Sequence, residues 1–228
     1  MVIAAQTFAQ TAPQYSGIDL GTLGGRHSRA LGVNNSGQVV GIAYTTNNTA
    51  SHTFLYSTGS IKDLGTFGGT YSEADAINDS GQVAGSAETA TGLRCAFLYS
   101  NGSMSDLGSL GDTESAAAGI NSTGQVVGYA VTSNNATNHA FLYSSAGMKD
   151  LGTLGGSDSL ATDINDSGQI AGYSATSRTG NHAFLYTNGS MGDLGTSGGT
   201  NSVAAAINHP KRRILLDNSR DGVIGALI

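Results

Sequence analysis

The chain has 228 residues and a formal net charge of −6 at pH 7, and only 11 % of its residues are charged, compared with about 25 % in ordinary domains. An acidic chain is a poor match for the phosphates of nucleic acid, and its only basic cluster, Lys211-Arg212-Arg213, is interpreted as a solvated tail, so nucleic acid is not expected as a partner. No apolar stretch approaches the roughly 20 residues that span a bilayer, and the single cysteine, Cys95, excludes an intrachain disulfide.

The first 14 residues differ from the rest of the chain. They contain small residues in an A-x-A-like pattern, but they lack a basic start and a full apolar core. We interpret residues 1–14 as the remnant of an export signal or as a disordered arm. Residues 15–228 then form a single repeat domain, with a degenerate tail at 209–228.

The tripeptide Asp-Leu-Gly recurs at a nearly fixed spacing. Its copies lie 43 or 44 residues apart and begin at Asp19, Asp63, Asp106, Asp150 and Asp193. A fixed period of this length is typical of an array of one supersecondary unit. The repeat is therefore the strongest evidence in the sequence for the fold class.

Four segments of each copy have the composition of β-strands. In the fourth copy they are residues 159–165, 169–174, 182–186 and 191–195. The first segment is rich in alanine and glycine, as suits a strand crowded near an axis, and the other three contain β-branched and aromatic residues.

Turn residues separate these segments. Asn-Asp-Ser-Gly at 165–168 predicts a type I turn closed by a left-handed glycine, and Asn-Gly at 188–189 predicts a tight hairpin. Gly-Gly at 198–199 would let the chain turn sharply into the next copy. Four antiparallel strands per copy, repeated, is the pattern of β-propeller blades.

The two ends of the repeat array are complementary in this interpretation. Residues 15–21 supply a fourth strand without a blade, and residues 202–208 supply a first strand without a complete blade. Joined, they would close a five-bladed ring; an open β-solenoid is the alternative. Residues 217–225 are interpreted as a degenerate second strand after an insertion, with a truncated end as the alternative.

Three motifs carry a resemblance to a known family. Asp-Leu-Gly-Thr-Leu-Gly-Gly, Ile-Asn-x-Ser-Gly-Gln-Val-Val-Gly and His-Ala-Phe-Leu-Tyr resemble the HAF family of probable extracellular repeats, over about residues 17–208. The resemblance implies an exported, extracellular or periplasmic protein with a propeller-like fold. It implies no activity.

Most recurring polar residues are interpreted as scaffold. The repeated histidines His52, His139 and His182 would lie one per blade, too far apart to share a metal, and Cys95 occupies the same position in another copy. The aspartates of Asp-Leu-Gly are expected to cap the following turn.

Calcium is the one cofactor that the repeat suggests. Asparagines end the first strand of every copy and would surround one mouth of a central channel; they are Asn34, Asn78, Asn121, Asn165 and Asn208. Oxygen ligands converging there could bind Ca²⁺, whereas the alternative is that these residues organise the turns. With calcium, a lactonase- or esterase-type hydrolase would be possible by analogy with other propellers.

Residues that differ between copies are better candidates for a binding site than those that recur. They follow the Gly-Gly pair on the same side of every blade, and so should gather at one mouth of the ring. The candidates are Arg26, His27, Arg29, Tyr71, Glu73, Asp75, Asp112, Glu114, Asp158 and Asp163. Glu73, Asp75 and Asp163 are also the candidates for a catalytic role.

Two functions remain open at this point. The first is an exported β-propeller that binds a small molecule, a glycan or a protein at one face. The second is a calcium-dependent hydrolase at the mouth of the channel. The sequence leaves the ligand, the substrate and the oligomeric state open.

Overall fold

The structure is a computed structural model that describes residues 17–133, 137–178, 180–196 and 198–207, together with the backbone of 214–218 and 223–227. In these residues every element is a β-strand except for one short 3-10 turn, Thr46–Asn48. No described helix is long and apolar enough to cross a bilayer.

Four blades repeat one order of four antiparallel strands. Blade 1 contains β1 (Gly24–Val33), β2 (Val39–Thr45), β3 (Ser51–Ser57) and β4 (Ser60–Gly65). Blade 2 contains β5 (Gly68–Ile77), β6 (Val83–Thr89), β7 (Arg94–Ser100) and β8 (Ser103–Asp106). Blade 3 contains β9 (Gly111–Ile120), β10 (Val126–Thr132), β11 (Asn138–Ser144) and β12 (Gly147–Asp150). Blade 4 contains β13 (Gly155–Ile164), β14 (Ile170–Thr176), β15 (Asn181–Thr187) and β16 (Ser190–Gly195).

The turns form as their residues predict. The backbone N–H of Gly168 donates to the carbonyl of Asn165 at 3.0 Å, and Gly168 has a φ of 74°, the left-handed value that glycine tolerates best. Asn188 and Gly189 have φ values of 52° and 84°, as a type I′ hairpin requires. The first strand of each blade is longer than predicted, because it begins at the glycine pair rather than at the serine.

A phenylalanine from the third strand fills the centre of each blade. Phe54, Phe97, Phe141 and Phe184 are fully buried. Each lies opposite a glycine of the second strand, such as Gly128 opposite Phe141. A Cβ at Gly128 would lie 2.0 Å from the carbonyl oxygen of Ala116, so only glycine fits between the first and third strands.

Neighbouring blades are joined by a recurring serine. The backbone N–H of Ala140 in blade 3 donates to Ser159 Oγ in blade 4 at 2.8 Å, and this hydroxyl donates in turn to the carbonyl of Gly152 at 2.6 Å. The same pair of bonds joins the other blades through Ser72, Ser115 and Ser202. One repeated geometry therefore sets the angle between all the blades.

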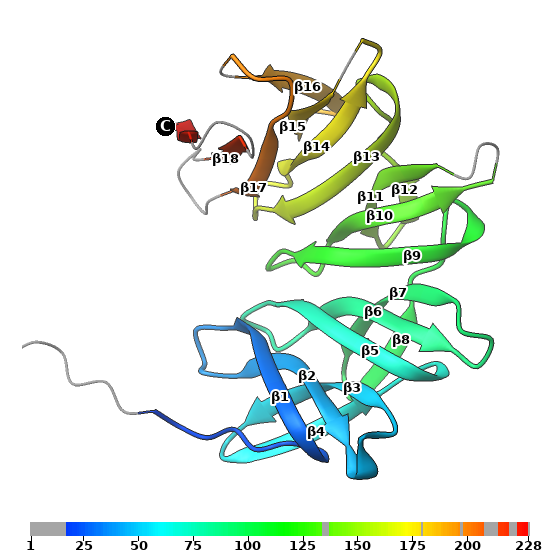
Figure 1. Cartoon of the computed structure of the whole chain (residues 1–228), viewed down its shortest axis with the longest axis vertical. Helices are drawn as coiled ribbons and strands as arrows, with labels where there is room; N and C mark the ends of the chain where they lie inside the picture. Colours follow the sequence, from blue (N-terminus) through cyan, green and yellow to red (C-terminus); the bar gives the residue numbers. More distant parts are fainter. Residues whose placement is uncertain are drawn as a thin grey trace, which may run out of the picture.

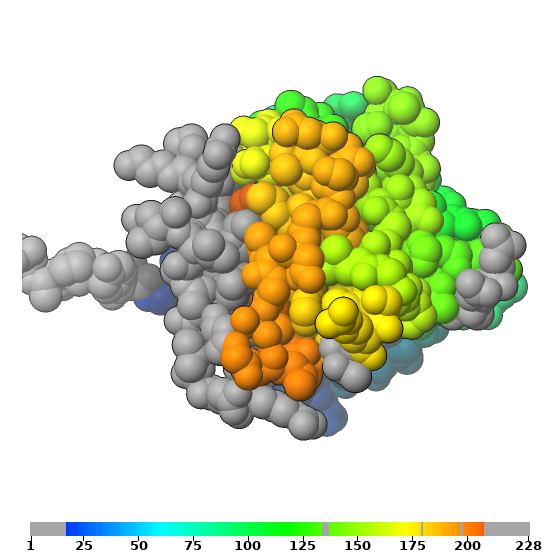
Figure 2. All heavy atoms as spheres, turned by 90° about the horizontal axis from the view of Figure 1, so that it is seen from above, coloured from blue at the N-terminus to red at the C-terminus, as the bar shows by residue number. Residues whose placement is uncertain are grey.

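The blades follow an arc that is open on one side, between β1 and a last sheet of three strands (Figure 1). That sheet contains β17 (Val203–Ile207), β18 (Ile214–Asn218) and β19 (Val223–Leu227). Viewed from above, β13 to β17 form much of the near surface, in yellow-green to orange (Figure 2).

The described residues show no clasp between the two chain ends, and the five-bladed ring is not closed. Residues 17–22 form no strand, and β17, β18 and β19 form a sheet without them. The interpretation of 217–225 as the second strand is wrong, because β18 takes that place and β19 is the third strand. The run Ile214-Leu215-Leu216 is near β17 in the sequence, so pairing the two closes only a short loop. Residues 1–16, 208–213, 219–222 and 228 lie outside the described residues, so the interpretation of residues 1–14 stays a prediction.

Candidate functional site

Each first strand carries a β-bulge at the same position. In β5, Ala74 lies opposite Gly85 and Ala76 lies opposite Ala84, so Asp75 is the extra residue. The same register shift makes Leu31 and Thr162 the extra residues of β1 and β13. Bulges turn a side chain away from the regular alternation of a strand and are common next to binding sites. In the bulges of the first four blades, only blade 2 places a charged residue at this position.

Glu73 joins blade 1 to blade 2. Its Oε1 accepts a hydrogen bond from a terminal guanidinium nitrogen of Arg29 at 2.7 Å, and its Oε2 accepts one from the Tyr71 hydroxyl at 2.6 Å. The guanidinium of Arg94 lies over the Tyr71 ring, 5.0 Å from its centroid. Opposite charges and an aromatic ring thus form one connected cluster at the first junction.

The cluster changes the acidity of two of its members. Burial and the neighbouring Glu73 carboxylate raise the pKa of Asp75 to about 7, against the opposing effect of Arg94 and Arg29. Asp75 is nevertheless an exposed residue of β5, so neighbouring groups surround its carboxylate without shutting it off from solvent. Burial and the hydrogen bond to Glu73 raise the pKa of Tyr71 to about 12. Asp75 is therefore poised to gain or lose a proton near neutral pH.

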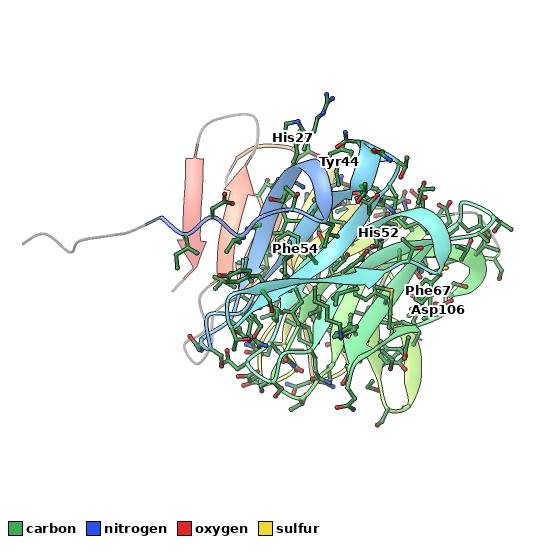
Figure 3. The ribbon with its side chains drawn as sticks, turned by 90° about the horizontal axis from the view of Figure 1, so that it is seen from below. His27, Tyr44, His52, Phe54, Phe67 and Asp106 are labelled. Carbon is green, nitrogen blue, oxygen red and sulfur yellow. The ribbon has the colours of Figure 1, made fainter. Side chains whose placement is uncertain are left out.

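A hollow of about 270 Å³ opens beside this cluster, between blades 1 and 2. His27 and Tyr44 form one of its walls, with ring centroids 6.1 Å apart and an edge-to-face angle of 71°. Figure 3 shows these two side chains next to each other at one end of blade 1. Arg29, Tyr71 and Glu73 form the opposite side. The hollow therefore combines an aromatic wall with charged hydrogen-bonding groups.

Tyr71 distinguishes the first junction from the third and fourth. At the third junction Asp158 Oδ1 accepts the backbone N–H of Asn138 at 3.1 Å, and at the fourth Asn201 Oδ1 accepts that of Asn181 at 2.9 Å. These short side chains cover the start of the third strand. Tyr71 holds the same position at the first junction, but its hydroxyl is bonded to Glu73 instead.

Not all of the predicted residues join the cluster. Asp163 is taken up by the scaffold, since its two oxygens accept the backbone N–H groups of Ile164 and Ile207. Asp112 and Glu114 are exposed on β9, and Arg26 is exposed on β1. The structure brings together four of the predicted residues with His27 beside them: Arg29, Tyr71, Glu73 and Asp75.

Sequence reasoning missed Arg94, Tyr44 and Ser51. Tyr44 lies near the end of the second strand of blade 1, and Ser51 and Arg94 begin the third strands of blades 1 and 2. Gly24 pairs with Thr45, so the end of the second strand lies beside the start of the first. The sequence did contain a signal for Arg94. The equivalent residues in the other copies, Ser51, Asn138 and Asn181, are uncharged, so Arg94 is a difference between copies.

The asparagines proposed for calcium form a ladder between blades. Asn121 Oδ1 accepts the backbone N–H groups of Thr123 and Gln125, and its Nδ2 donates to Gln125 Oε1 and to the carbonyl of Asn165. Asn34 and Asn78 reach the next blade in the same way, and Asn208 lies outside the described residues. These contacts favour the turn-organising role over a metal-binding one.

A second hollow, of about 380 Å³, lies where the asparagine ladder meets Asp79 and Asp166. Hydrogen bonds from the backbone and side chain of Asn35 lower the pKa of Asp79. Among the described residues, no group of three or more histidine, cysteine, aspartate or glutamate side chains is arranged to bind a metal.

The repeated histidines bond to the repeated aspartates within each blade. Nδ1 of His52, His139 and His182 lies 2.8–2.9 Å from the nearer carboxylate oxygen of Asp63, Asp150 and Asp193. The same carboxylates accept the backbone N–H two residues later, as in Asp150 with Gly152 at 2.7 Å. Partial burial opposes ionisation of Asp193, but the bonds from His182 and Gly195 prevail and lower its pKa. The predicted capping of the turn is confirmed.

No family model and no curated protein matches the chain. Among solved structures, it is similar to TolB from Acinetobacter baumannii, with a TM-score of 0.55 and 15 % sequence identity. The match covers 83 % of this chain and 51 % of TolB, so the chain spans about half of that protein's length. At this identity the likeness shows the fold alone: an all-β, propeller-like arrangement of blades that is not closed into a ring.

Proposed function

We propose that this chain is an exported, non-enzymatic propeller-like protein that binds the end of a glycan in the hollow between blades 1 and 2. Export rests on the resemblance to the HAF repeats. Glycan binding rests on the composition of the hollow. The supporting observation is that Tyr44, Tyr71 and His27 lie beside the paired charges of Arg29 and Glu73.

Sugars offer two kinds of surface, and the hollow has a partner for each. The C–H face of a sugar ring packs on aromatic side chains, while its hydroxyls bond to guanidinium and carboxylate groups that can donate or accept in fixed directions. The volume, about 270 Å³, lies just below the range of roughly 300–1,000 Å³ of drug-sized sites. A ligand of about one or two sugar rings suits such a site.

Arg29 is the residue best placed to contact such a ligand. Its side chain is 66 % exposed although one nitrogen is bonded to Glu73, so its other N–H groups remain open to solvent. An uncharged sugar could use these donors, and a sugar carboxylate would bind them more strongly. Acidic sugars are therefore the preferred ligands in this proposal.

The test is an oligosaccharide array that includes uronic and sialic acids, probed with the labelled chain. We expect retention on a subset of glycans, and at least about tenfold weaker retention for Arg29→Ala. Arg178→Ala is the control, because Arg178 is an exposed arginine outside the hollow, in the loop between β14 and β15 of blade 4. Equal retention of both variants, or none by the wild-type chain, would refute the proposal.

A hydrolase is the second candidate, and one observation favours it. Glu73 is held in an ion pair with Arg29, while the pKa of Asp75 is raised to about 7, which is suitable for general acid–base chemistry. Calcium would have to bind elsewhere than the asparagine ladder. A panel of lactones and esters, assayed with and without a chelator, tests this candidate, and Asp75→Asn should abolish any turnover found.

A further inference from the structure

The face of β1 is exposed where every other first strand is buried. Ala74, Ala117, Ala161 and Ala204 are no more than 4 % exposed, whereas Ala30, at the same position in blade 1, is exposed. Val33 is 68 % exposed, whereas its equivalent Ile77 in blade 2 is partly buried, and Ile120, Ile164 and Ile207 in the later sheets are no more than 9 % exposed. The later strands are covered because each packs on the blade before it.

Ser28 shows the same difference in its hydrogen bonds. Its hydroxyl donates to the carbonyl of Gly21 at 2.7 Å, as the other serines donate to their equivalent glycines. Ser72, Ser115, Ser159 and Ser202 also accept a backbone N–H from the third strand of the preceding blade, at 2.8–2.9 Å. Among the described residues, none donates to Ser28. The Ser28 oxygen can therefore accept one more hydrogen bond. In the other blades this bond comes from the third strand of the preceding blade.

The other end of the arc presents such a strand. Ala204 lies opposite Leu216, and Leu216 opposite Gly225, as Ala161, Gly172 and Phe184 pair in blade 4. Ile224 of β19 thus corresponds to Ala183, whose N–H reaches the next serine. In the described residues β19 is an edge strand, and no fourth strand follows it. Residues 17–21, which precede β1, have the sequence of the end of a fourth strand, and the carbonyl of Gly21 accepts the bond from Ser28.

We infer that β1 docks the β17–β19 sheet of a second copy of this chain, in a head-to-tail contact that repeats the junction between blades. The backbone N–H of Ile224 from one copy would bond to Ser28 Oγ of the other, and Ala30 and Val33 would be covered. A second copy fits better than closure of one chain on itself. The serine and asparagine bonds set the angle at each junction, and the arc that results leaves β1 and β17 on opposite sides of an opening (Figure 1).

The contact has a definite symmetry. One copy uses β1 and the other uses β19, so the interface is heterologous, and the pair as a whole keeps one unused β1 face and one unused β19 edge. Such contacts give chains of copies, or a closed ring if the angles allow it. The mass of the assembly should therefore rise with concentration rather than stop sharply at one value, unless a ring closes.

Sedimentation velocity and light scattering on the full chain, from about 1 to about 100 µM, test the inference in the range where moderate interfaces associate. We expect concentration-dependent association, weakened at least about tenfold by Val33→Lys and by Ala30→Glu. Ser105→Lys is the matched control, because this exposed position of β8 holds Lys62 and Lys149 in two other copies.

Both test positions are exposed, so neither substitution should disturb the fold of one copy, and melting temperatures would verify this. A monomer at every concentration overturns the inference, including a monomer in which hydrogen exchange finds the β1 amides protected by the same chain's own sheet. Association that Val33→Lys and Ala30→Glu leave unchanged also overturns it. Glycan binding plays no part in this outcome, so the two proposals stand or fall separately.

Discussion

Arg29 and Glu73 are 44 residues apart, occupy the same position in successive blades, and meet in an ion pair of 2.7 Å. The repeat brings equivalent positions of neighbouring blades side by side, so a difference between copies becomes a contact in space. Here the position holds a positive charge in blade 1, Arg29, and a negative charge in blade 2, Glu73. Such a pair adds little to stability where one partner is largely exposed, but it orients two charged groups at the edge of a hollow.

Thr53 is the one described residue with a buried side-chain oxygen that lacks a hydrogen-bond partner. Ala96, Ala140 and Ala183 hold this position in the other blades. Thr53→Ala should therefore raise the free energy of unfolding by about 0.5–2 kcal/mol, because an unpaired hydroxyl is no longer buried. Urea unfolding measures this. The reverse change, Ala140→Thr, should destabilise the chain, and a loss of stability in Thr53→Ala would contradict the prediction.

The asparagine ladder depends on a donor at Nδ2. Asn121→Asp would place a carboxylate oxygen next to Gln125 Oε1 and the Asn165 carbonyl, where only a donor fits. We expect a loss of about 3 kcal/mol or more, because a buried charge would face acceptors. Asn101→Asp, at an exposed hairpin turn, is the control and should cost much less. Similar losses in the two variants would show that the ladder adds no stability.

Two substitutions show how much each partner of a histidine–aspartate pair contributes to stability. His139→Cys should cost less than about 1 kcal/mol, because Cys95 fills this position in blade 2. Asp150→Ala should cost more, about 1–2 kcal/mol, since it removes the bonds to both His139 and Gly152. Chemical unfolding of both variants decides the order, and a larger loss in His139→Cys would show that the imidazole, not the carboxylate, organises the turn.

The raised pKa of Asp75 predicts that the stability of the fold depends on pH. Its pKa in the folded chain is raised to about 7 from 3.8. Between these values the folded state holds a proton that the unfolded state lacks, so this group makes stability fall as the pH rises from about 4 to about 7. Asp75→Asn should remove that fall, and the variant should melt higher than wild type at pH 8 with little difference at pH 4.

The control for this experiment is Glu114→Gln, which removes an exposed acid from the neighbouring blade. Its melting temperature should follow that of the wild type across the same range. Parallel curves for wild type and Asp75→Asn would show that Asp75 has an ordinary pKa in the folded chain.

The repeated part of the fold is readable from the sequence because each local feature has one physical cause. Gly168 must take a left-handed φ, Gly128 must leave room for the next strand, and Phe141 must fill the blade. The chain ends were harder to predict. The second strand of the last sheet begins at Ile214, before the damaged Asn-x-Ser-Gly-like run at 217–225 that was expected to form it, so no motif of the repeat marks its position.

The site was predictable only in part. Residues that differ between copies pointed to Arg29, Tyr71, Glu73 and Asp75, and those four do meet. Asp163 has the same kind of sequence signal, but its carboxylate bonds to backbone N–H groups. The difference lies in the bulge, which makes Asp75 the extra residue and leaves Asp163 paired, and the sequence does not mark bulges.

Tyr71→Asp gives the most direct test of the site. It installs at the first junction the type of side chain with which Asp158 bonds the third strand of the preceding blade, and it removes the aromatic ring and hydroxyl that Tyr71 contributes to the hollow. In titration calorimetry with the oligosaccharide that the array retains best, the account predicts at least about tenfold weaker binding by Tyr71→Asp than by wild type. Equal affinities would contradict it.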